Sequence, residues 1–136
     1  MTHFENSFFE EFKFTQAQIQ AYLASAEKDL VIAFDSNVPE VIFQFSYNAL
    51  IKLGIISIAK HGYRAHSKTG HHAKILEKLA ELLGDDEVAV VGNLMRKTRN
   101  IELYSGGSVI TDKQAREYLE FCTKITQTVR RHLTDI

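Results

Sequence analysis

The stretch PEVIFQFSYNALIKLGIISIAK, residues 39–60, decides the fold of this chain. Its apolar residues, from Val41 to Ile58, cover nearly the whole circumference of a helix, and a helix of that kind is buried on several sides. Many of them are β-branched, which leaves a strand as the alternative, but the length of the stretch and its lack of alternation favour a helix. Pro39 fits the first turn and Gly62 follows the last. We therefore predict a central core helix.

The same stretch is long enough to raise the question of a membrane span. Gln44, Asn48 and Lys52 interrupt its apolar surface, so a buried core helix fits better than a membrane-spanning one. The first residues show no basic segment followed by an apolar run, so no signal peptide is predicted. We expect no membrane association and a cytoplasmic location.

Helical patterns flank this core helix on both sides. Thr15 and Gln18 have the spacing of a capping box at the start of one helix, and Thr111 and Gln114 repeat it at the start of the last. Two further helices are expected, one before Gly84 and one after it. No strand pattern is evident. The expected fold class is all-α, an antiparallel bundle of four long helices plus one short helix.

The composition agrees with a single domain spanning residues 1–136. The chain has 136 residues, of which 45% are hydrophobic and 24% charged, as in ordinary soluble globular proteins. Its net charge of −1 excludes binding of nucleic acid through overall charge, so such a contact requires a local patch. The single cysteine, Cys122, excludes an internal disulfide framework. Its place on an apolar helical stripe predicts a buried thiol.

A phenylalanine-rich arm occupies residues 1–14. Phe4, Phe8 and Phe12 have the spacing of one helical stripe. The arm is expected either to pack onto its own domain or to cover a partner subunit.

The most informative stretch for function is RKTRNIELY, which begins at Arg96 and ends at Tyr104. It is predicted to form the last turns of a helix, where residues four apart share a face. Arg96 and Asn100 therefore share a face, as do Asn100 and Tyr104, with Arg99 on its flank. Together with Lys97, this cluster of donors can bind an anion such as phosphate. The alternative is a solvated basic face.

This arrangement resembles the signature of the HEPN superfamily, in which an Arg and a polar residue are followed, after a short spacer, by a His. Arg99 matches the motif Arg and Asn100 the polar residue, while Tyr104 stands where the His is expected. The resemblance covers residues 38–130 and extends upstream of the motif. The upstream positions are Tyr47, Ala49, Leu50, Leu53, Gly54, Ala59, Lys60, His61, Gly62, Gly70, His71 and His72.

The resemblance implies a helical, homodimeric protein that acts on RNA at a site assembled across the dimer. Arg99 would bind the scissile phosphate or stabilise its developing charge, and Asn100 would orient it. Tyr104 departs from the family pattern, because a tyrosine with an ordinary pKa of about 10 is a poor general base near neutral pH. It can still donate a hydrogen bond or stack on a base. Some members are toxins silenced by a nucleotidyltransferase, which makes such an antitoxin a candidate partner.

A second cationic cluster follows the core helix. Four histidines, His61, His66, His71 and His72, lie near Arg64 in the sequence. Their spacing matches no helical ligand pair, and no thiolate or acid cluster completes a site, so neither a metal nor a cofactor is expected. Contact with phosphate through Arg64 and His71 is the functional interpretation, and a solvated loop is the alternative.

Three functions follow from these observations. The first is an RNA- or nucleotide-binding HEPN domain, the toxin-like member of a toxin–antitoxin pair. The second is a non-catalytic helical protein–protein interaction module. The third is a weak metal-independent endoribonuclease, with Arg99 and Tyr104 as catalytic residues or with His61 in place of Tyr104. The predicted phosphate- or RNA-binding residues are Arg96, Lys97, Arg99, Asn100, Tyr104, Arg64 and His71.

Overall fold

The computed structural model describes residues 3–68, 70–105 and 110–134, except for the side chains of residues 102–105. Five helices and a two-stranded sheet make up this part of the chain, so the mainly helical class is confirmed. Four helices have 20 to 23 residues and one has 13, as predicted. The helices are α1 (Gln16–Asp35), α2 (Pro39–Lys60), α3 (His71–Leu83), α4 (Asp86–Ser105) and α5 (Asp112–Thr134).

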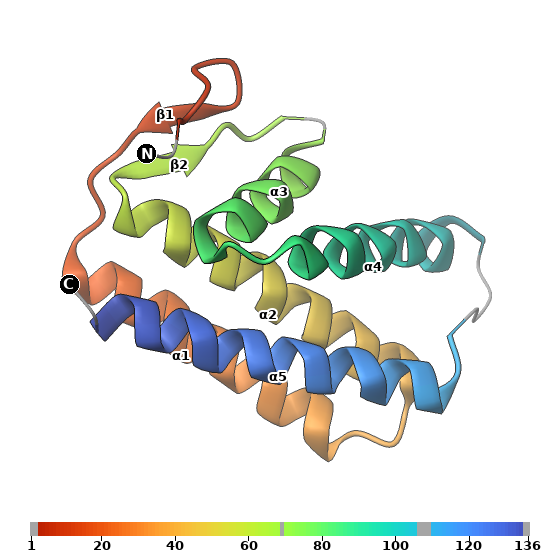
Figure 1. Ribbon diagram of the computed structural model, residues 1–136. Helices are drawn as coiled ribbons and strands as arrows, with labels where there is room; N and C mark the ends of the chain where they lie inside the picture. Colours follow the sequence, from red (N-terminus) through yellow and green to blue (C-terminus); the bar gives the residue numbers. More distant parts are fainter. Residues whose placement is uncertain (1–2, 69, 106–109, 135–136) are drawn as a thin grey trace.

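α2 is the centre of the fold (Figure 1), and it contacts the other four helices. α1 and α5 pack on one side of it, while α3 and α4 pack against each other and on α2. α2 is long and apolar enough to cross a membrane by length and composition, and 67% of its most apolar window is buried inside the bundle. This burial fits the predicted core helix.

The helix directions differ in part from a wholly antiparallel bundle. α1 and α2 are antiparallel, but α5 runs in the same direction as α2 (Figure 1). At the starts of α2 and α5, Arg116 Nη2 donates to the Ser36 carbonyl at 3.3 Å; at their ends, Lys60 Nζ donates to the Leu133 carbonyl at 2.8 Å. α5 runs parallel to α2 because α3 and α4 together return the chain to the end of the bundle where α2 begins.

Both predicted capping boxes are present. The Thr15 hydroxyl accepts from the Gln18 N–H at 3.1 Å, and the Gln18 amide oxygen accepts from the Thr15 N–H at 2.8 Å. Thr111 and Gln114 form the same pair at the start of α5, at 3.0 and 3.1 Å. These local signals position the two helices that flank α2.

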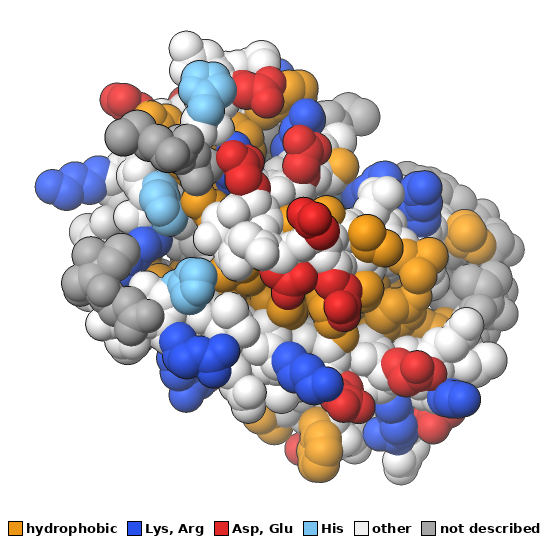
Figure 2. Space-filling model, in the orientation of Figure 1, with side chains coloured by type: hydrophobic (Ala, Val, Ile, Leu, Met, Phe, Trp, Pro, Cys, Tyr) orange, Lys and Arg blue, Asp and Glu red, His pale blue; other side chains and the backbone are white. Residues whose placement is uncertain are grey.

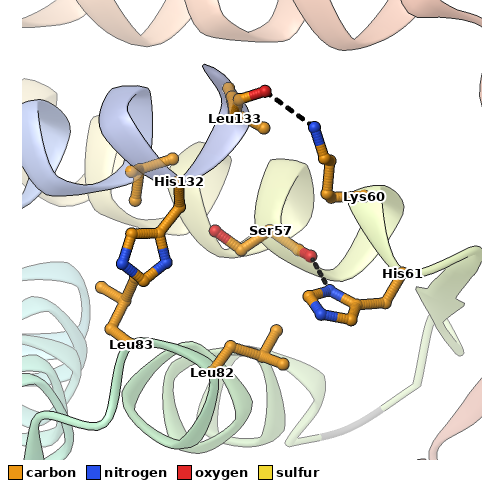
Figure 3. A pocket seen from close by; sticks show the side chains of 8 residues that line it. Ser57, Lys60, His61, Leu82, Leu83, His132 and Leu133 are labelled. Carbon is orange, nitrogen blue, oxygen red and sulfur yellow. Dashed lines mark hydrogen bonds between the residues drawn. The ribbon is translucent and has the colours of Figure 1, made fainter. Parts of the chain in front are cut away.

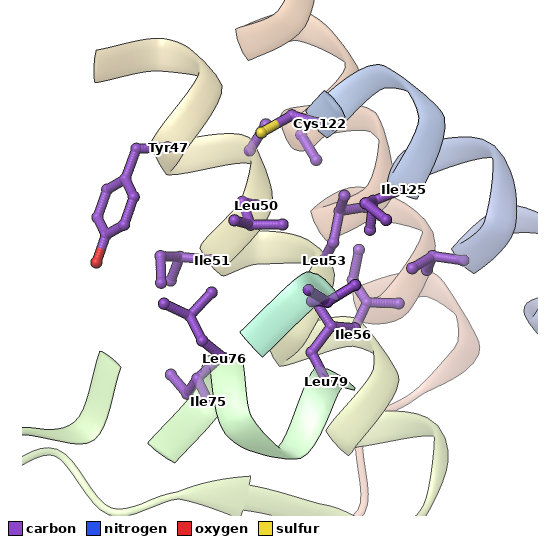
Figure 4. Packing of buried hydrophobic residues seen from close by; sticks show 14 of the residues in the cluster. Tyr47, Leu50, Ile51, Leu53, Ile56, Ile75, Leu76, Leu79, Cys122 and Ile125 are labelled. Carbon is purple, nitrogen blue, oxygen red and sulfur yellow. The ribbon is translucent and has the colours of Figure 1, made fainter. Parts of the chain in front are cut away.

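The core forms where apolar faces of α2, α3 and α5 meet (Figure 4). Gly54 allows α2 and α3 to approach closely, because a Cβ placed there would lie 2.3 Å from Ile75 Cγ2. Cys122 is fully buried in α5, and burial raises the pKa of its thiol, as the predicted buried thiol requires. The side chains labelled in Figure 4 are Tyr47, Leu50, Ile51, Leu53, Ile56, Ile75, Leu76, Leu79, Cys122 and Ile125.

The sequence prediction of no strands is wrong at two short segments. β1 (Phe9–Glu11) lies in the phenylalanine-rich arm and pairs antiparallel with β2 (Tyr63–Ala65), which lies in the loop after α2. The arm is therefore extended at β1, and its phenylalanine side chains do not form one stripe of a helix. Phe4 is buried and stacks on Tyr63, with ring centroids 4.2 Å apart, so the arm packs on its own domain.

α4 does not bury the whole of its apolar side. Met95 and Val88 are buried, whereas Val90, Leu94 and Ile101 are 68%, 53% and 51% exposed. Figure 2 shows hydrophobic side chains exposed in the right-hand half of the molecular face, over the region of α4. The apolar side chains of this helix are thus divided between the core and the surface.

Candidate functional site

A pocket of 490 Å³ lies between the start of α3 and the second half of α4. Arg96, Arg99 and Asn100 line it from α4, because spacings of three and four place them on one helical face. His71 and His72 line it from α3. We call it the cationic pocket, and its lining residues are Ser67, Lys68, Gly70, His71, His72, Arg96, Arg99 and Asn100.

The two arginines of this pocket are oriented by neighbouring side chains. Arg96 Nε and Nη2 donate to Asn93 Oδ1 at 3.0 and 2.8 Å, one helical turn earlier. Arg99 lies over the ring of Tyr47, with its Cζ 5.8 Å from the ring centroid, within the range of a cation–π contact. Among the described residues, no carboxylate lies within ion-pair distance of either guanidinium. Among the side chains that the structure describes, both guanidinium groups are thus without an ion pair.

A histidine from α3 faces the arginines, and α2 holds it in place. Tyr47 is almost completely buried in α2, and its hydroxyl lies 3.1 Å from His72 Nδ1. The rings are 5.8 Å apart between centroids. The His71 ring is a further 4.6 Å from that of His72, and His71 Nδ1 lies 2.8 Å from the Lys68 carbonyl. This network joins three helices at one pocket.

The electrostatics of the pocket keep its histidine neutral and its tyrosine protonated. The pKa of His72 is lowered to about 4, mainly by burial and in addition by the neighbouring His71, Arg99 and Arg96. Burial raises the pKa of Tyr47 to about 12, although Arg99 and Arg96 oppose this shift. His72 thus has one ring nitrogen available for chemistry, because its Nδ1 is engaged by Tyr47.

The structure places two predicted site residues, Lys97 and Arg64, outside this pocket. Lys97 is exposed on α4 and does not line it. Arg64 lies in β2, where its Nε donates to Glu10 Oε1 at 2.8 Å and its guanidinium covers the Phe12 ring at 4.1 Å. The Tyr104 side chain lies outside the described residues.

His61, proposed from the sequence as a substitute for the motif His, lines a different pocket (Figure 3). Its Nδ1 lies 3.0 Å from the Ser57 carbonyl, and the pocket of 240 Å³ lies between the ends of α2, α3 and α5, beside His132. The cationic pocket is formed by other segments, so the structure does not bring His61 to Arg99. Within the described part of the chain, no three His, Cys, Asp or Glu side chains are placed to hold a metal ion.

Sequence reasoning predicted residues on both walls of the pocket, Arg96, Arg99 and Asn100 in α4 and His71 in α3, but it missed Asn93 and the contact between Tyr47 and His72. Asn93 lies three positions before Arg96, and this helical spacing is a signal that was available. Tyr47 and His72 are 25 residues apart, and no local pattern predicts their contact. Their pairing depends on the close packing of α2 on α3.

The pocket has the donors that can hold an anion. Guanidinium groups bind phosphate oxygens through paired N–H donors, and the first turn of α3 adds backbone N–H groups and a positive helix dipole. His72 adds a neutral imidazole beside the same space.

Comparison of the chain with protein-family models, with curated proteins and with solved structures gave no match.

Proposed function

We propose that the protein binds RNA or nucleotides through phosphate in the cationic pocket, as a HEPN-like domain. The observation that carries this proposal is the pair Arg96 and Arg99, which line an open pocket without a carboxylate partner among the described residues. Asn93 and the Tyr47 ring contact these arginines and orient their guanidinium groups at the pocket. Guanidinium groups held in this way suit an external anion such as phosphate.

The test of this proposal is the binding of a fluorescein-labelled single-stranded RNA, followed by anisotropy. Wild-type protein is expected to bind, and Arg96→Ala is expected to bind at least about tenfold more weakly, as loss of a charge-assisted hydrogen bond requires. Circular dichroism checks that helix content is unchanged. Equal affinity of the two proteins would contradict the proposed site.

The same proposal includes assembly into a homodimer through α4. Val90, Leu94 and Ile101 are exposed on the helix that carries both arginines, and exposed apolar side chains in a row favour a protein contact. A nucleotidyltransferase antitoxin as a further partner rests on the family resemblance alone, and co-purification of the two proteins tests it.

A second function, weak metal-independent endoribonuclease activity, has His72 as its candidate base, and the base is weak because burial lowers its pKa to about 4. In the tautomer whose Nδ1–H donates to the Tyr47 oxygen, His72 Nε2 carries the lone pair that can accept the proton of an RNA 2′-hydroxyl. The 2′-oxygen then bonds to phosphorus, the bond to the 5′-oxygen breaks, and that oxygen takes a proton from water. A 2′,3′-cyclic phosphate and a 5′-hydroxyl result, with Arg99 stabilising the charge on phosphorus.

This second function is tested by incubating mixed RNA with the protein in the presence of a chelator. Cleavage that survives chelation and is lost in both Arg99→Ala and His72→Gln would support it. Cleavage that persists in His72→Gln would exclude His72 as the base. Absence of cleavage by the wild type leaves phosphate binding as the proposed function.

A further inference from the structure

A second pocket, of 430 Å³, adjoins the cationic pocket. Ser67, His71 and His72 line both, so the two pockets share a wall at the start of α3. The remaining walls come mainly from aromatic and aliphatic side chains of the arm, α1 and α2. We call it the aromatic pocket, and the residues used below are Phe12, Phe14, Gln18, Tyr22, Ile55 and His71.

The aromatic side chains form a ring-lined edge. The Phe12 and Phe14 centroids are 4.7 Å apart, and those of Phe14 and Tyr22 are 6.2 Å apart with ring planes at 85°. Tyr22 is 37% exposed, so its ring is open to a ligand. Ile55 is half-buried on the opposite element, α2. A flat, uncharged ring system fits between walls of this kind.

Polar groups at the same edge suit a heterocycle better than a purely apolar ligand. Gln18 lines the pocket, and its amide oxygen is engaged in the α1 capping box, which leaves its amide nitrogen as a donor for a ring nitrogen or carbonyl. Arg64 also lines this edge, where Glu10 pairs with its guanidinium and the Phe12 ring lies under it at 4.1 Å. An apolar chain such as a lipid tail would leave the Gln18 amide nitrogen unpaired.

We propose that the aromatic pocket is the base subsite of the cationic pocket, so that the ligand is a nucleotide. Its phosphate would lie against Arg96 and Arg99, and its base against Tyr22 and Phe14. This inference rests on the proposed function, because the phosphate has to be held in the cationic pocket for the base to reach its neighbour. The shared wall of His71 and His72 lies between the two parts of the ligand.

The experiment compares two probes that differ only by the base. Ribose 5-phosphate and adenosine 5′-monophosphate are titrated by calorimetry into the wild type, Tyr22→Ala and Tyr22→Phe. Phe34→Ala is the matched control, because Phe34 is also an α1 aromatic side chain, is 73% exposed, and does not line the aromatic pocket. Since Tyr22 is partly exposed, its substitution leaves the core intact.

The wild type is expected to bind adenosine 5′-monophosphate at least about tenfold more tightly than ribose 5-phosphate, the contribution of one stacked base. Tyr22→Ala should remove most of that difference without changing ribose 5-phosphate binding, while Tyr22→Phe and Phe34→Ala should keep it. Equal affinity of the wild type for the two probes would overturn the base subsite and leave the phosphate site standing. If neither probe binds, the proposed function is overturned as well.

Discussion

Replacement of Arg99 by alanine tests whether phosphate binds through directed hydrogen bonds in the cationic pocket or only through the positive charge of the surface. Arg99 is half-buried, lines the cationic pocket and has no carboxylate partner among the described residues. A hydrogen bond between charged groups contributes about 1.5–3 kcal/mol. Each 1.4 kcal/mol is about tenfold in affinity, so Arg99→Ala is expected to weaken binding of adenosine 5′-monophosphate by roughly 10- to 150-fold.

The matched control is Lys97→Ala, two positions earlier on the same helix. It removes the same charge from an exposed side chain outside the pocket, where water and salt screen its effect. Its effect on affinity is expected to be about twofold or less, in the range of exposed ion pairs. Arg99→Lys keeps the charge but loses the paired donors, so its affinity should lie between those of Arg99→Ala and the wild type.

Calorimetric titration gives the affinities, and thermal unfolding checks that each variant is folded. Equal losses in Arg99→Ala and Lys97→Ala would refute the reasoning, because net charge alone would then explain binding. Unfolding of Arg99→Ala would show instead that this arginine is structural.

Four further outcomes are expected. RNA affinity should fall steeply as salt rises from 50 to 200 mM, since phosphate contacts release counterions; a salt-independent affinity contradicts this. The pKa of His72 is lowered to about 4 in the folded protein, so its contribution to stability is complete above about pH 6.5 and is lost as pH falls towards 4; urea unfolding at pH 7 and 4.5 should show a smaller drop in His72→Gln. Gly54→Ala should lower the free energy of unfolding in urea by about 1–2 kcal/mol, because the added Cβ would lie 2.3 Å from Ile75 Cγ2. The control Gly92→Ala should have a smaller effect, because the nearest atom there is a Leu76 methyl group at 3.1 Å. Leu94→Glu should convert a dimer to a monomer in light scattering; an unchanged mass would remove α4 from the interface.

The helices were predictable because their signals are local. Periodic apolar residues identify α2, and the Thr15 and Thr111 capping boxes mark the starts of α1 and α5 within the sequence itself. The direction of α5 was not predictable from such signals. It depends on how α3 and α4 return the chain, which is a matter of packing between elements far apart in sequence.

The small sheet was missed for a related reason. Each strand has three residues, too few for alternation to stand out, and Phe9 pairs with Ala65 across more than fifty positions. The phenylalanine spacing in the arm suggested a helix instead. In the structure, the stacking of Phe4 on Tyr63 and the pairing of Arg64 with Glu10 stabilise the extended arm.

The same division applies to the candidate site. Arg96, Arg99 and Asn100 meet because of helical spacing, which the sequence contains. His72 joins them only because α2 and α3 pack closely enough for Tyr47 to reach it. Tyr104 and His61 are the sequence-based candidates for a proton-transfer role, whereas the histidines that line the pocket with the arginines are His71 and His72.

The most direct test of the central claim is a two-dimensional ¹H–¹⁵N NMR titration of the protein with adenosine 5′-monophosphate. The account predicts that the largest amide shifts occur in residues 67, 68, 70–72 and 96–100, in the two segments that line the cationic pocket. Shifts that instead centre on the pocket around His61 and His132, or no shifts at millimolar nucleotide, would contradict it.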